Sequence, residues 1–512
     1  MVKTSINPLS DNPLPKNALS DTNQPYDQTV WKADWKQGYE SQWQESEYWI
    51  EQVEGQIPLD LQGTLFRNGP GSLDVNGQPL LHPIDGDGMI CAIAFSQGRA
   101  YFRNRFVRTE GFLAEQMAGR ILYRGPFGTQ KPGGWLANAF DLRLKNTANT
   151  SVIYWGDRLL ALWEAAEPYR LSPDNLETLG LDRLDGLLKP GEAFSAHPRI
   201  DPGSERTHNQ PRLINFGVKQ GLSSKIALYE IDPSWTVVQR QTRFIPGFAL
   251  LHDFAITPNY YLFFQNPLSF NPLPYLLGWS SAFQSLKFQP DRPSNIILIP
   301  RHDTTKPIRI LPTKNCFIFH HANAFEQDNR IYLDSSTYST FATLEPNLPY
   351  HQIDFDTYPA AELWRFEIDL SSNTVQPHPI ESRHCEFPSL RPDRMGRPYQ
   401  YLYLSAAEAL RGNAPGQVIL KHDLKTGEQQ AWSVAPRGFV GEPAFVPRPN
   451  GTAEDDGWLL TLIYNAETHR SELAILDARN VSCGTVARLF LKYHIPHGLH
   501  GYFTQQYFGP DF

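Results

Sequence analysis

Cysteines are scarce in this sequence, and long hydrophobic runs are missing from it. Its 512 residues contain only four cysteines, and no two of them form a CxxC pair. This pattern disfavours both a disulfide scaffold and a thiolate zinc site. No window holds the ~18 consecutive apolar residues of a membrane-spanning helix, and the polar N-terminus lacks the apolar centre of a signal peptide. We therefore expect a cytoplasmic protein that is at most peripherally associated with a membrane.

Blocks of basic residues are also missing. The formal net charge is −8, and no stretch concentrates lysine and arginine. A nucleic-acid partner is therefore disfavoured. The hydrophobic fraction of 41% and the charged fraction of 20% are instead typical of a folded globular protein.

β-Strand patterns make up most of the chain. Residues 1–28 are polar and rich in proline and asparagine, which predicts an extended or disordered arm. From residue 61 onward, short β-like runs alternate with turn residues, as in SVIYW–GD–RLLALWE and KIALYEI–DPS–WTVVQRQ. An antiparallel series of this length must close on itself or expose its edges, and a β-propeller is the usual closed solution. We therefore predict an all-β fold in which residues 29–512 form one propeller domain.

Three segments depart from this pattern. Residues 110–121, 175–188 and 274–288 have helical patterns and predict helices inserted between strands. Segments 271–288 and 110–121 also predict contact with a membrane surface through apolar side chains. The side chains in question are Leu276, Leu277, Trp279, Phe283 and Phe288 in the first segment, and Phe112, Leu113 and Met117 in the second. The alternative for both segments is a helix packed against the propeller.

The stretch CFIFHHANAFE, residues 316–326, is the most informative in the chain. Its bulky residues before position 320 predict a buried strand, and His320 and His321 follow at the end of that strand. Adjacent side chains of a strand point to opposite faces, so both imidazoles rarely serve one site. The stretch alone leaves open whether one of them binds a ligand or both pair with the backbone in the core.

Three other histidines, His197, His252 and His500, also lie at the ends of apolar runs. The separations along the series 197, 252, 320 and 500 are 55, 68 and 180 residues. They are close to one, one and three times a spacing of ~60 residues, slightly longer than a common propeller blade. Equivalent positions on different blades point toward the central axis, so a closed propeller would bring these imidazoles together. Four neutral imidazoles suit iron, copper, zinc or nickel, and the spacing does not choose among them.

Three acidic residues have apolar, strand-like surroundings: Glu164 in LLALWEAAEP, Glu386 in HCEFPSL and Glu442 in FVGEPAFVP. A histidine that binds a metal usually donates its second N–H to a carboxylate or carbonyl. A buried carboxylate needs such a partner because an unpaired charge is costly inside a protein. An arginine on a neighbouring strand would satisfy the same need.

The order and number of motifs identify a resemblance to the carotenoid cleavage oxygenase family, nearest to its microbial apocarotenoid oxygenases. The resemblance covers the chain from about residue 30 to its end. It rests on GTLFRNGPG, DGDGMI, YFRNRFVRT, NTANTSVIYW, LLALWEAAEPY, FSAHPRIDP, LHDFAITPNYYLFFQNP, FHHANAFE, CEFPSLRP, GEPAFVPRP and GLHGYF.

The resemblance implies a seven-bladed β-propeller with Fe(II) on its axis and a cap of loops and short helices. The family's four iron ligands fall on His197, His252, His320 and His500, which leaves His321 as a neighbour. The glutamates that support three of those ligands fall on Glu164, Glu386 and Glu442. The extra histidines His494 and His497 are expected only to hydrogen-bond within their loop.

The resemblance also implies the reaction, in which dioxygen cleaves one C=C bond of a polyene such as an apocarotenoid and gives two carbonyl products. Thr150 falls on the position whose small side chain lies beside the iron, and we expect its methyl group to block one coordination site. Trp163 is expected to form an apolar wall of the substrate tunnel, where relatives that cleave stilbenes tend to have lysine. The alternatives are a stilbene or phenylpropanoid dioxygenase, and a carotenoid-binding protein without catalysis.

Overall fold

The computed structural model describes residues 28–204, 207–221, 223–341, 349, 352 and 358–511. The predicted N-terminal arm lies outside the described residues except for Gln28, which begins helix α1 (Gln28–Gln37).

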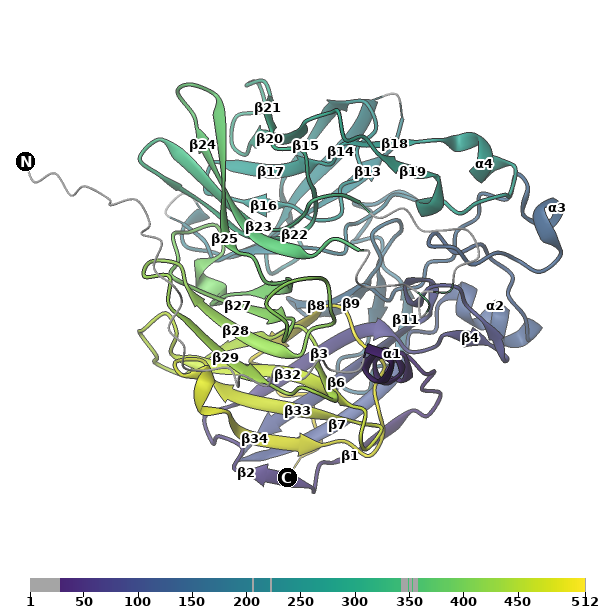
Figure 1. Ribbon diagram of the computed structural model, residues 1–512, viewed down its shortest axis with the longest axis vertical. Coiled ribbons are helices and arrows are strands. Elements are labelled where there is room, and N and C mark those ends of the chain that lie inside the picture. Colours follow the sequence, from purple (N-terminus) through teal and green to yellow (C-terminus); the bar gives the residue numbers. More distant parts are fainter. Residues whose placement is uncertain are drawn as a thin grey trace, which may run out of the picture.

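Seven antiparallel sheets form the body of the molecule, and they follow one another around a centre (Figure 1). The first contains β1 (Ser46–Trp49), β7 (Arg99–Phe106), β6 (Gly88–Ser96), β3 (Gly63–Pro70) and β35 (Gly501–Thr504). The second contains β11 (Thr178–Leu181), β10 (Tyr169–Leu171), β9 (Arg158–Leu162) and β8 (Ser151–Trp155). The third contains β12 (Arg199–Asp201), β13 (Arg212–Lys219), β14 (Ser223–Ile231) and β15 (Val237–Pro246). The fourth contains β16 (Ala255–Ile256), β17 (Tyr260–Gln265), β20 (Ser294–Pro300) and β21 (Arg309–Thr313).

The remaining three sheets complete the ring. The fifth contains β22 (Phe317–Gln327), β23 (Arg330–Tyr338), β24 (Ala361–Asp369) and β25 (Thr374–Glu381). The sixth contains β26 (Cys385–Ser389), β27 (Tyr401–Ala406), β28 (Val418–Asp423) and β29 (Gln429–Ser433). The seventh contains β2 (Val53–Gly55), β34 (Thr485–Phe490), β33 (Arg470–Asp477), β32 (Gly457–Asn465), β31 (Ala444–Pro447) and β30 (Gly438–Val440). The fold is therefore the predicted seven-bladed propeller.

Strands from the two ends of the chain close the ring. The C-terminal strand β35 pairs with β3 of the first blade, with Leu65 opposite Phe503. The N-terminal strand β2 pairs with β34 of the last blade, with Glu54 opposite Arg488. This exchange fastens the first and last blades to each other and removes an open edge between them.

The hydrophobic core lies in layers between neighbouring blades. Ile93 of the first blade and Leu473 of the last belong to one buried cluster. Leu298 of the fourth blade and Ile331 of the fifth belong to another. Strand β6, which is buried on both faces, is accordingly apolar along almost its whole length.

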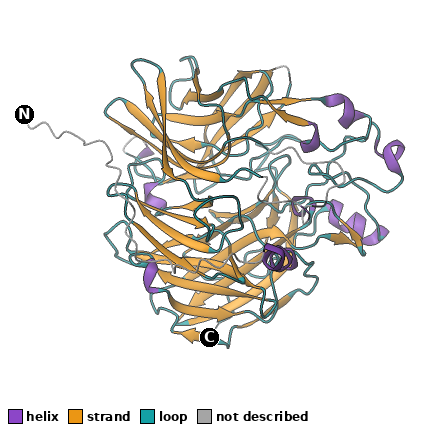
Figure 2. Ribbon diagram, viewed as in Figure 1, coloured by secondary structure: helices purple, strands orange, loops and turns teal. Residues whose placement is uncertain are grey.

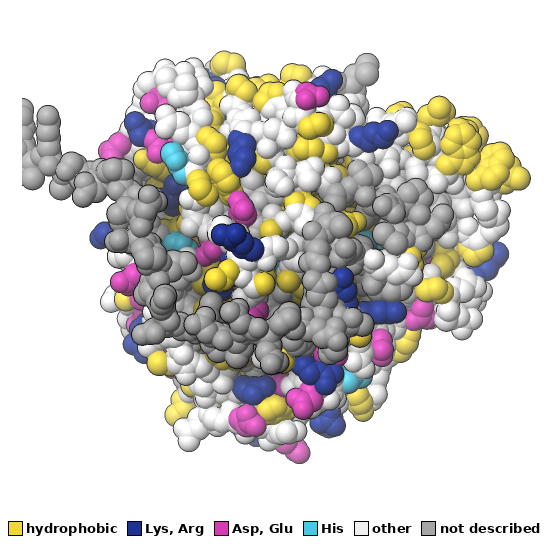
Figure 3. All heavy atoms as spheres, in the orientation of Figure 1, with side chains coloured by type: hydrophobic (Ala, Val, Ile, Leu, Met, Phe, Trp, Pro, Cys, Tyr) yellow, Lys and Arg dark blue, Asp and Glu magenta, His cyan; other side chains and the backbone are white. Residues whose placement is uncertain are grey.

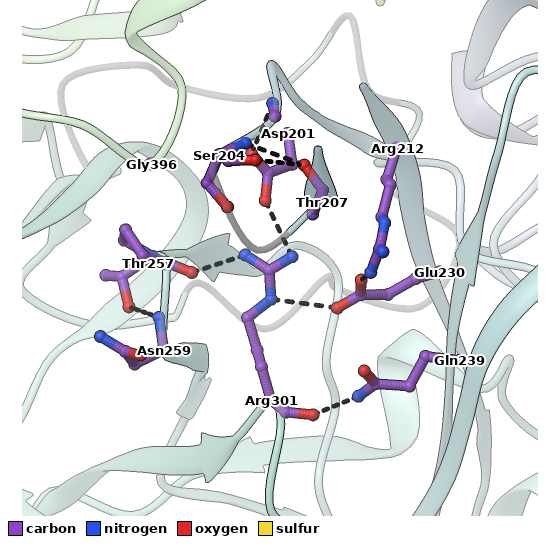
Figure 4. Close-up of polar contacts among 12 residues, drawn as sticks. Asp201, Ser204, Thr207, Arg212, Glu230, Gln239, Thr257, Asn259, Arg301 and Gly396 are labelled. Carbon is purple, nitrogen blue, oxygen red and sulfur yellow. Dashed lines mark hydrogen bonds and ion pairs between the residues drawn. The ribbon is translucent and has the colours of Figure 1, made fainter. Parts of the chain in front are cut away.

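A buried arginine joins the third blade to the fourth (Figure 4). The guanidinium of Arg301 donates to Glu230 at 3.0 Å and to the carbonyl of Thr257 at 2.7 Å, and it pairs with Asp201 at 2.8 Å. Arg212 binds the second oxygen of Glu230 at 2.8 Å. Because each charge has partners, the cluster is tolerated in the core, and it fixes the end of β12, which begins two residues after His197.

Helices are few, and α2 (Glu110–Ala118), α3 (Gly134–Asn138) and α4 (Pro272–Leu276) lie together along one edge (Figure 2). Helix α2 confirms the prediction for 110–121, and it begins where the Thr109 hydroxyl accepts from the N–H of Phe112. Among the described residues, no helix is both long enough and apolar enough to cross a membrane.

The other two predicted helices are wrong. Segment 175–188 contains β11 instead, because Leu176, Gly180 and Leu184 adopt positive φ angles that interrupt any helix. Segment 274–288 contains only the end of α4, a 3₁₀ turn (Phe283–Ser285) and β19 (Leu286–Phe288). Gly278, with φ of 72°, stops the helical turn, and β19 pairs with β18 (Leu268–Phe270).

Candidate metal centre

Four imidazoles meet inside the propeller. The candidate ligand nitrogens of His197, His252, His320 and His500 all lie within 4.8 Å of one another. His320 belongs to β22, and each of the other three lies in a loop just before an inner strand: β12, β16 or β35. The structure therefore brings together the four histidines that sequence analysis named as candidate ligands.

The cluster fits a metal ion. The Nε2 atom of His320 is buried and has no hydrogen-bond partner among the described residues. Burial, helped by the neighbouring imidazoles, holds the pKa of His197 well below its usual value, and burial also lowers the pKa of His500. The Glu386 carboxylate outweighs burial at His320 and raises the pKa of that imidazole. Four imidazole nitrogens, deprotonated when they bind, suit a divalent transition metal.

Three carboxylates support three of the imidazoles. His252 Nδ1 lies 2.5 Å from Glu164 Oε2, and His320 Nδ1 lies 2.7 Å from Glu386 Oε2. His500 Nδ1 lies 2.9 Å from Glu442 Oε1. These contacts place the ring proton on Nδ1, so that Nε2 is the nitrogen that can bind a metal. The Nε2 atoms of His197 and His252 lie 2.9 Å apart. Within the described part of the chain, an arginine, the alternative partner, pairs with Glu442 alone of the three, in addition to His500.

Two further side chains hold the carboxylates, and sequence analysis missed both. Arg67 donates to Glu442 at 2.5 Å and to the carbonyl of Leu499 at 2.7 Å. The Tyr338 hydroxyl donates to Glu386 at 2.7 Å. Arg67 lies inside the motif GTLFRNGPG, which was the only signal that could have pointed to it.

The neighbouring histidines have other partners. His321 Nδ1 lies 2.7 Å from the Ser335 hydroxyl, so His321 is not part of the cluster, as expected. His494 and His497 donate to the carbonyls of Glu40 and Trp35, at 2.9 Å and 3.1 Å. Both histidines therefore act through hydrogen bonds, but they bind α1 and the segment after it rather than their own loop, which corrects the expectation.

A cavity of about 330 Å³ opens onto the metal cluster. Aromatic and other apolar side chains form most of its wall, and Thr150 lies on the wall together with His252, His320 and His500. The phenylalanines of this wall are Phe127, Phe283, Phe317, Phe319, Phe341 and Phe387. Trp163 is buried next to Glu164 but is not among the residues that line this cavity. The cavity is large enough to enclose a small hydrophobic molecule.

The motif HPIDGDG, residues 82–88, holds the cavity wall in place. Asp85 accepts the N–H groups of Phe127 and Thr129 at 2.9 Å and 3.0 Å. The amide of Asn149 donates to the carbonyls of Ile84 and Gly86 at 2.8 Å and 2.7 Å. The motif thus connects the wall residues near position 127 to the segment that contains Thr150.

A buried lysine ties the same motif to α2. Lys145 Nζ lies 2.7 Å from Asp87 Oδ2 and 2.6 Å from Glu115 Oε2. Glu115 also accepts from the backbone N–H of Leu122 at 2.8 Å, so the end of α2 is fixed to the loop that follows it. Sequence analysis missed this cluster.

Comparison with known proteins gives one consistent result. Residues 39–505 match the RPE65 family, described as retinal pigment epithelial membrane protein. The chain is 51% identical to the apocarotenoid-15,15'-oxygenase of Synechocystis over 94% of this chain and 99% of that protein. It is 30% identical to lignostilbene-alpha,beta-dioxygenase isozyme III of Sphingomonas paucimobilis over 88% of this chain and 92% of that protein. The crystal structure of the cobalt-substituted Synechocystis enzyme superposes with a TM-score of 0.91 at 52% identity, covering 93% of this chain and 99% of that one.

Proposed function

The chain belongs to the RPE65 family of carotenoid cleavage oxygenases, and on that premise we propose that it uses dioxygen to cleave one C=C bond of an apocarotenoid into two carbonyl products, such as retinal-type apocarotenals. The observation that supports this most directly is the cluster of four imidazoles, three of them paired with carboxylates, at the wall of an aromatic cavity.

Fe(II) is the metal we propose for the cluster, held by His197, His252, His320 and His500. Bound iron supplies the activation of dioxygen, which no side chain of the site can provide. Glu164, Glu386 and Glu442 orient three of the imidazoles and raise their basicity as ligands.

The side chains of the cavity wall bind and position the substrate. Its aromatic side chains hold a rigid conjugated chain by dispersion and shape and exclude water from it. We assign no side chain as a general acid or base, because adding one oxygen atom to each carbon of the broken bond requires no proton transfer from the protein.

Thr150 is proposed to limit access to the metal. It lines the cavity beside the cluster, and its hydroxyl lies 3.1 Å from Asn149 Oδ1. With the hydroxyl engaged there, the methyl group is available to fill space next to the metal. For Trp163, which is buried and is not among the residues that line the cavity, we propose no direct contact with the substrate.

A stilbene or phenylpropanoid dioxygenase is the second candidate, favoured by the identity to the lignostilbene enzyme. Among the described residues, however, the cavity is lined by no lysine or arginine that could hold a phenolate. A carotenoid-binding protein without catalysis is disfavoured because the imidazoles and their carboxylates are all present.

Iron analysis and product identification test the proposal together. The purified protein is expected to contain close to one iron per chain and to convert a β-apocarotenal into two aldehydes that mass spectrometry identifies. A hydroxystilbene serves as the competing substrate. Cleavage of the stilbene alone would establish the second candidate, and cleavage of neither substrate by the iron-loaded protein would contradict both.

A membrane surface is proposed as the source of the substrate, with the protein bound peripherally and otherwise cytoplasmic. Exposed apolar side chains gather where α3 and α4 lie (Figure 3). They are Trp135, Leu136, Phe140, Leu142, Leu273 and Trp279, and α2 adds Leu113 and Met117. Phe112 and Phe283, which the sequence suggested for this role, are buried instead, and Phe283 lines the cavity. The ring of Phe283 stacks on that of Phe127, a second residue of the cavity wall, at 3.9 Å.

A further inference from the structure

A second, smaller cavity of about 40 Å³ lies between the first and last blades. Its volume exceeds the ~10–15 Å³ that one water-sized molecule needs. Most of its wall is apolar, and the side chains that set this character are Pro70, Met89, Cys91, Leu462, Ile463 and Pro496.

One short segment separates this cavity from the metal centre. Gly498 lines the small cavity, whereas Leu499 and His500 line the large one. Gly69 packs against this segment so closely that a Cβ at position 69 would lie 2.6 Å from the Cα of Gly498. At this point the wall therefore consists of backbone without side chains, and it ends at a metal-cluster imidazole.

The small cavity favours an apolar guest over water. The Tyr464 hydroxyl already pairs with His469 at 2.9 Å, and the Ser471 hydroxyl donates to the carbonyl of Ile495 at 3.2 Å. Both terminal nitrogens of Arg67 are engaged, and only its Nε is without a partner among the described residues. A buried water needs two to four polar partners, and of these three side chains only Arg67 has an N–H that is not already engaged.

We propose that this cavity binds dioxygen and delivers it to the metal centre from the side opposite the polyene. The inference rests on the proposed function, which consumes one small apolar gas together with one long rigid substrate. A polyene in the large cavity obstructs the approach to the metal from that side, so a separate apolar path lets dioxygen arrive after the substrate has bound.

Xenon is the probe for the cavity itself, because apolar cavities stay dry and take up xenon. Crystals of the iron-loaded protein under xenon pressure are expected to show a xenon peak bounded by Met89, Leu462 and Pro496. Xenon in the large cavity alone would overturn the proposal, whether or not the enzyme is active.

Kinetics test the route. Gly441 lines the cavity, and a Cβ there would lie 3.4 Å from the carbonyl of Leu462 and 3.6 Å from Arg67 Nη2, so Gly441→Ala fills space without a clash. It is expected to raise the KM for dioxygen several-fold at saturating apocarotenal and to leave the KM for apocarotenal unchanged. Cys91→Ala enlarges the same cavity and is the matched control, for which the KM for dioxygen is not raised.

The outcomes separate this inference from the proposed function. Normal cleavage with an unchanged KM for dioxygen in an iron-replete Gly441→Ala variant would overturn the route and leave the function standing. If Gly441→Ala loses iron, Leu462→Phe fills the cavity from β32 and is judged by the same two KM values. Failure of the wild-type protein to cleave any polyene would overturn the function, and the dioxygen route with it.

Discussion

His320 and His321 are adjacent and chemically identical, yet the fold gives them different environments. His320 contributes a buried Nε2 to the metal cluster, whereas His321 pairs with Ser335 in the core. We expect His320→Ala to lose bound metal, because three donors remain and Glu386 loses its imidazole partner. His321→Ala is expected to retain metal. Metal analysis after desalting, with circular dichroism as the check on folding, distinguishes the two variants.

Loss of metal from His321→Ala, with metal retained in His320→Ala, would make His321 the ligand and His320 the neighbour. Register shifts on both sides of His321 in β22 explain why simple strand alternation could not decide it. The local pattern could only say that two adjacent imidazoles rarely serve one site.

The supporting carboxylates could be found from sequence, but the residues that hold them could not. Glu164, Glu386 and Glu442 are conspicuous as acids within apolar runs. Arg67 lies 375 residues before the glutamate that it binds, and Tyr338 lies 48 residues before its own. Contacts between blades at such separations leave no local pattern, so only the closed ring reveals them.

At the scale of elements, the segment HPIDGDG and α2 depend on one buried charge. Lys145 is 7% exposed and holds both Asp87 and Glu115. Lys145→Met is expected to lower the free energy of unfolding by about 3–5 kcal/mol, because it leaves two buried carboxylates without their cation. Urea unfolding measures the loss. Arg143→Met, at a side chain that is 72% exposed, is the control and should cost much less, because exposed ion pairs are screened by solvent. Equal losses in the two variants would contradict this account.

The apolar patch on α3 and α4 leads to a second expectation at this scale. Leu273 and Trp279 are each 58% exposed, and changing both to aspartate is expected to abolish sedimentation with liposomes, because charged groups resist insertion among lipids. Turnover of detergent-solubilised substrate should persist. Phe244→Asp changes a side chain that is 62% exposed on β15 and should leave liposome binding intact. Unchanged binding in the double variant would exclude the patch.

Elements with alternating patterns were predictable, and irregular ones were not. The hairpins β6–β7, β8–β9 and β14–β15 all form as their sequences indicate. Segment 175–188 has leucines at helical spacing but becomes an outer strand flanked by turns. Its positive φ angles at Leu176 and Leu184 follow from packing against the second blade, which no helical pattern encodes.

For the whole molecule, buried histidines predict loss of stability in mild acid. Burial lowers the pKa of His82 to about 3, and of His384 and His497 to about 4. In the unfolded chain these groups titrate near 6.5, so between about pH 6.5 and 4 the unfolded state binds more protons and stability falls as pH falls. Each such histidine contributes up to ~1.4 kcal/mol per pH unit.

Urea titrations across that range measure the slope. His384→Gln removes one of the titrating imidazoles, so the free energy of unfolding should depend less steeply on pH. The comparison requires that the glutamine side chain accept the N–H of Ala361 as the imidazole does. A free energy of unfolding that is independent of pH over this interval would contradict the prediction.

The pairing of β35 with β3 sets the order of events during synthesis. His500 immediately precedes β35, so the last imidazole leaves the ribosome after every other blade has emerged. The complete site therefore forms only once β35 has paired with β3 and the ring is closed. A chain terminated before position 500 would lack the fourth imidazole, so we expect it not to retain metal.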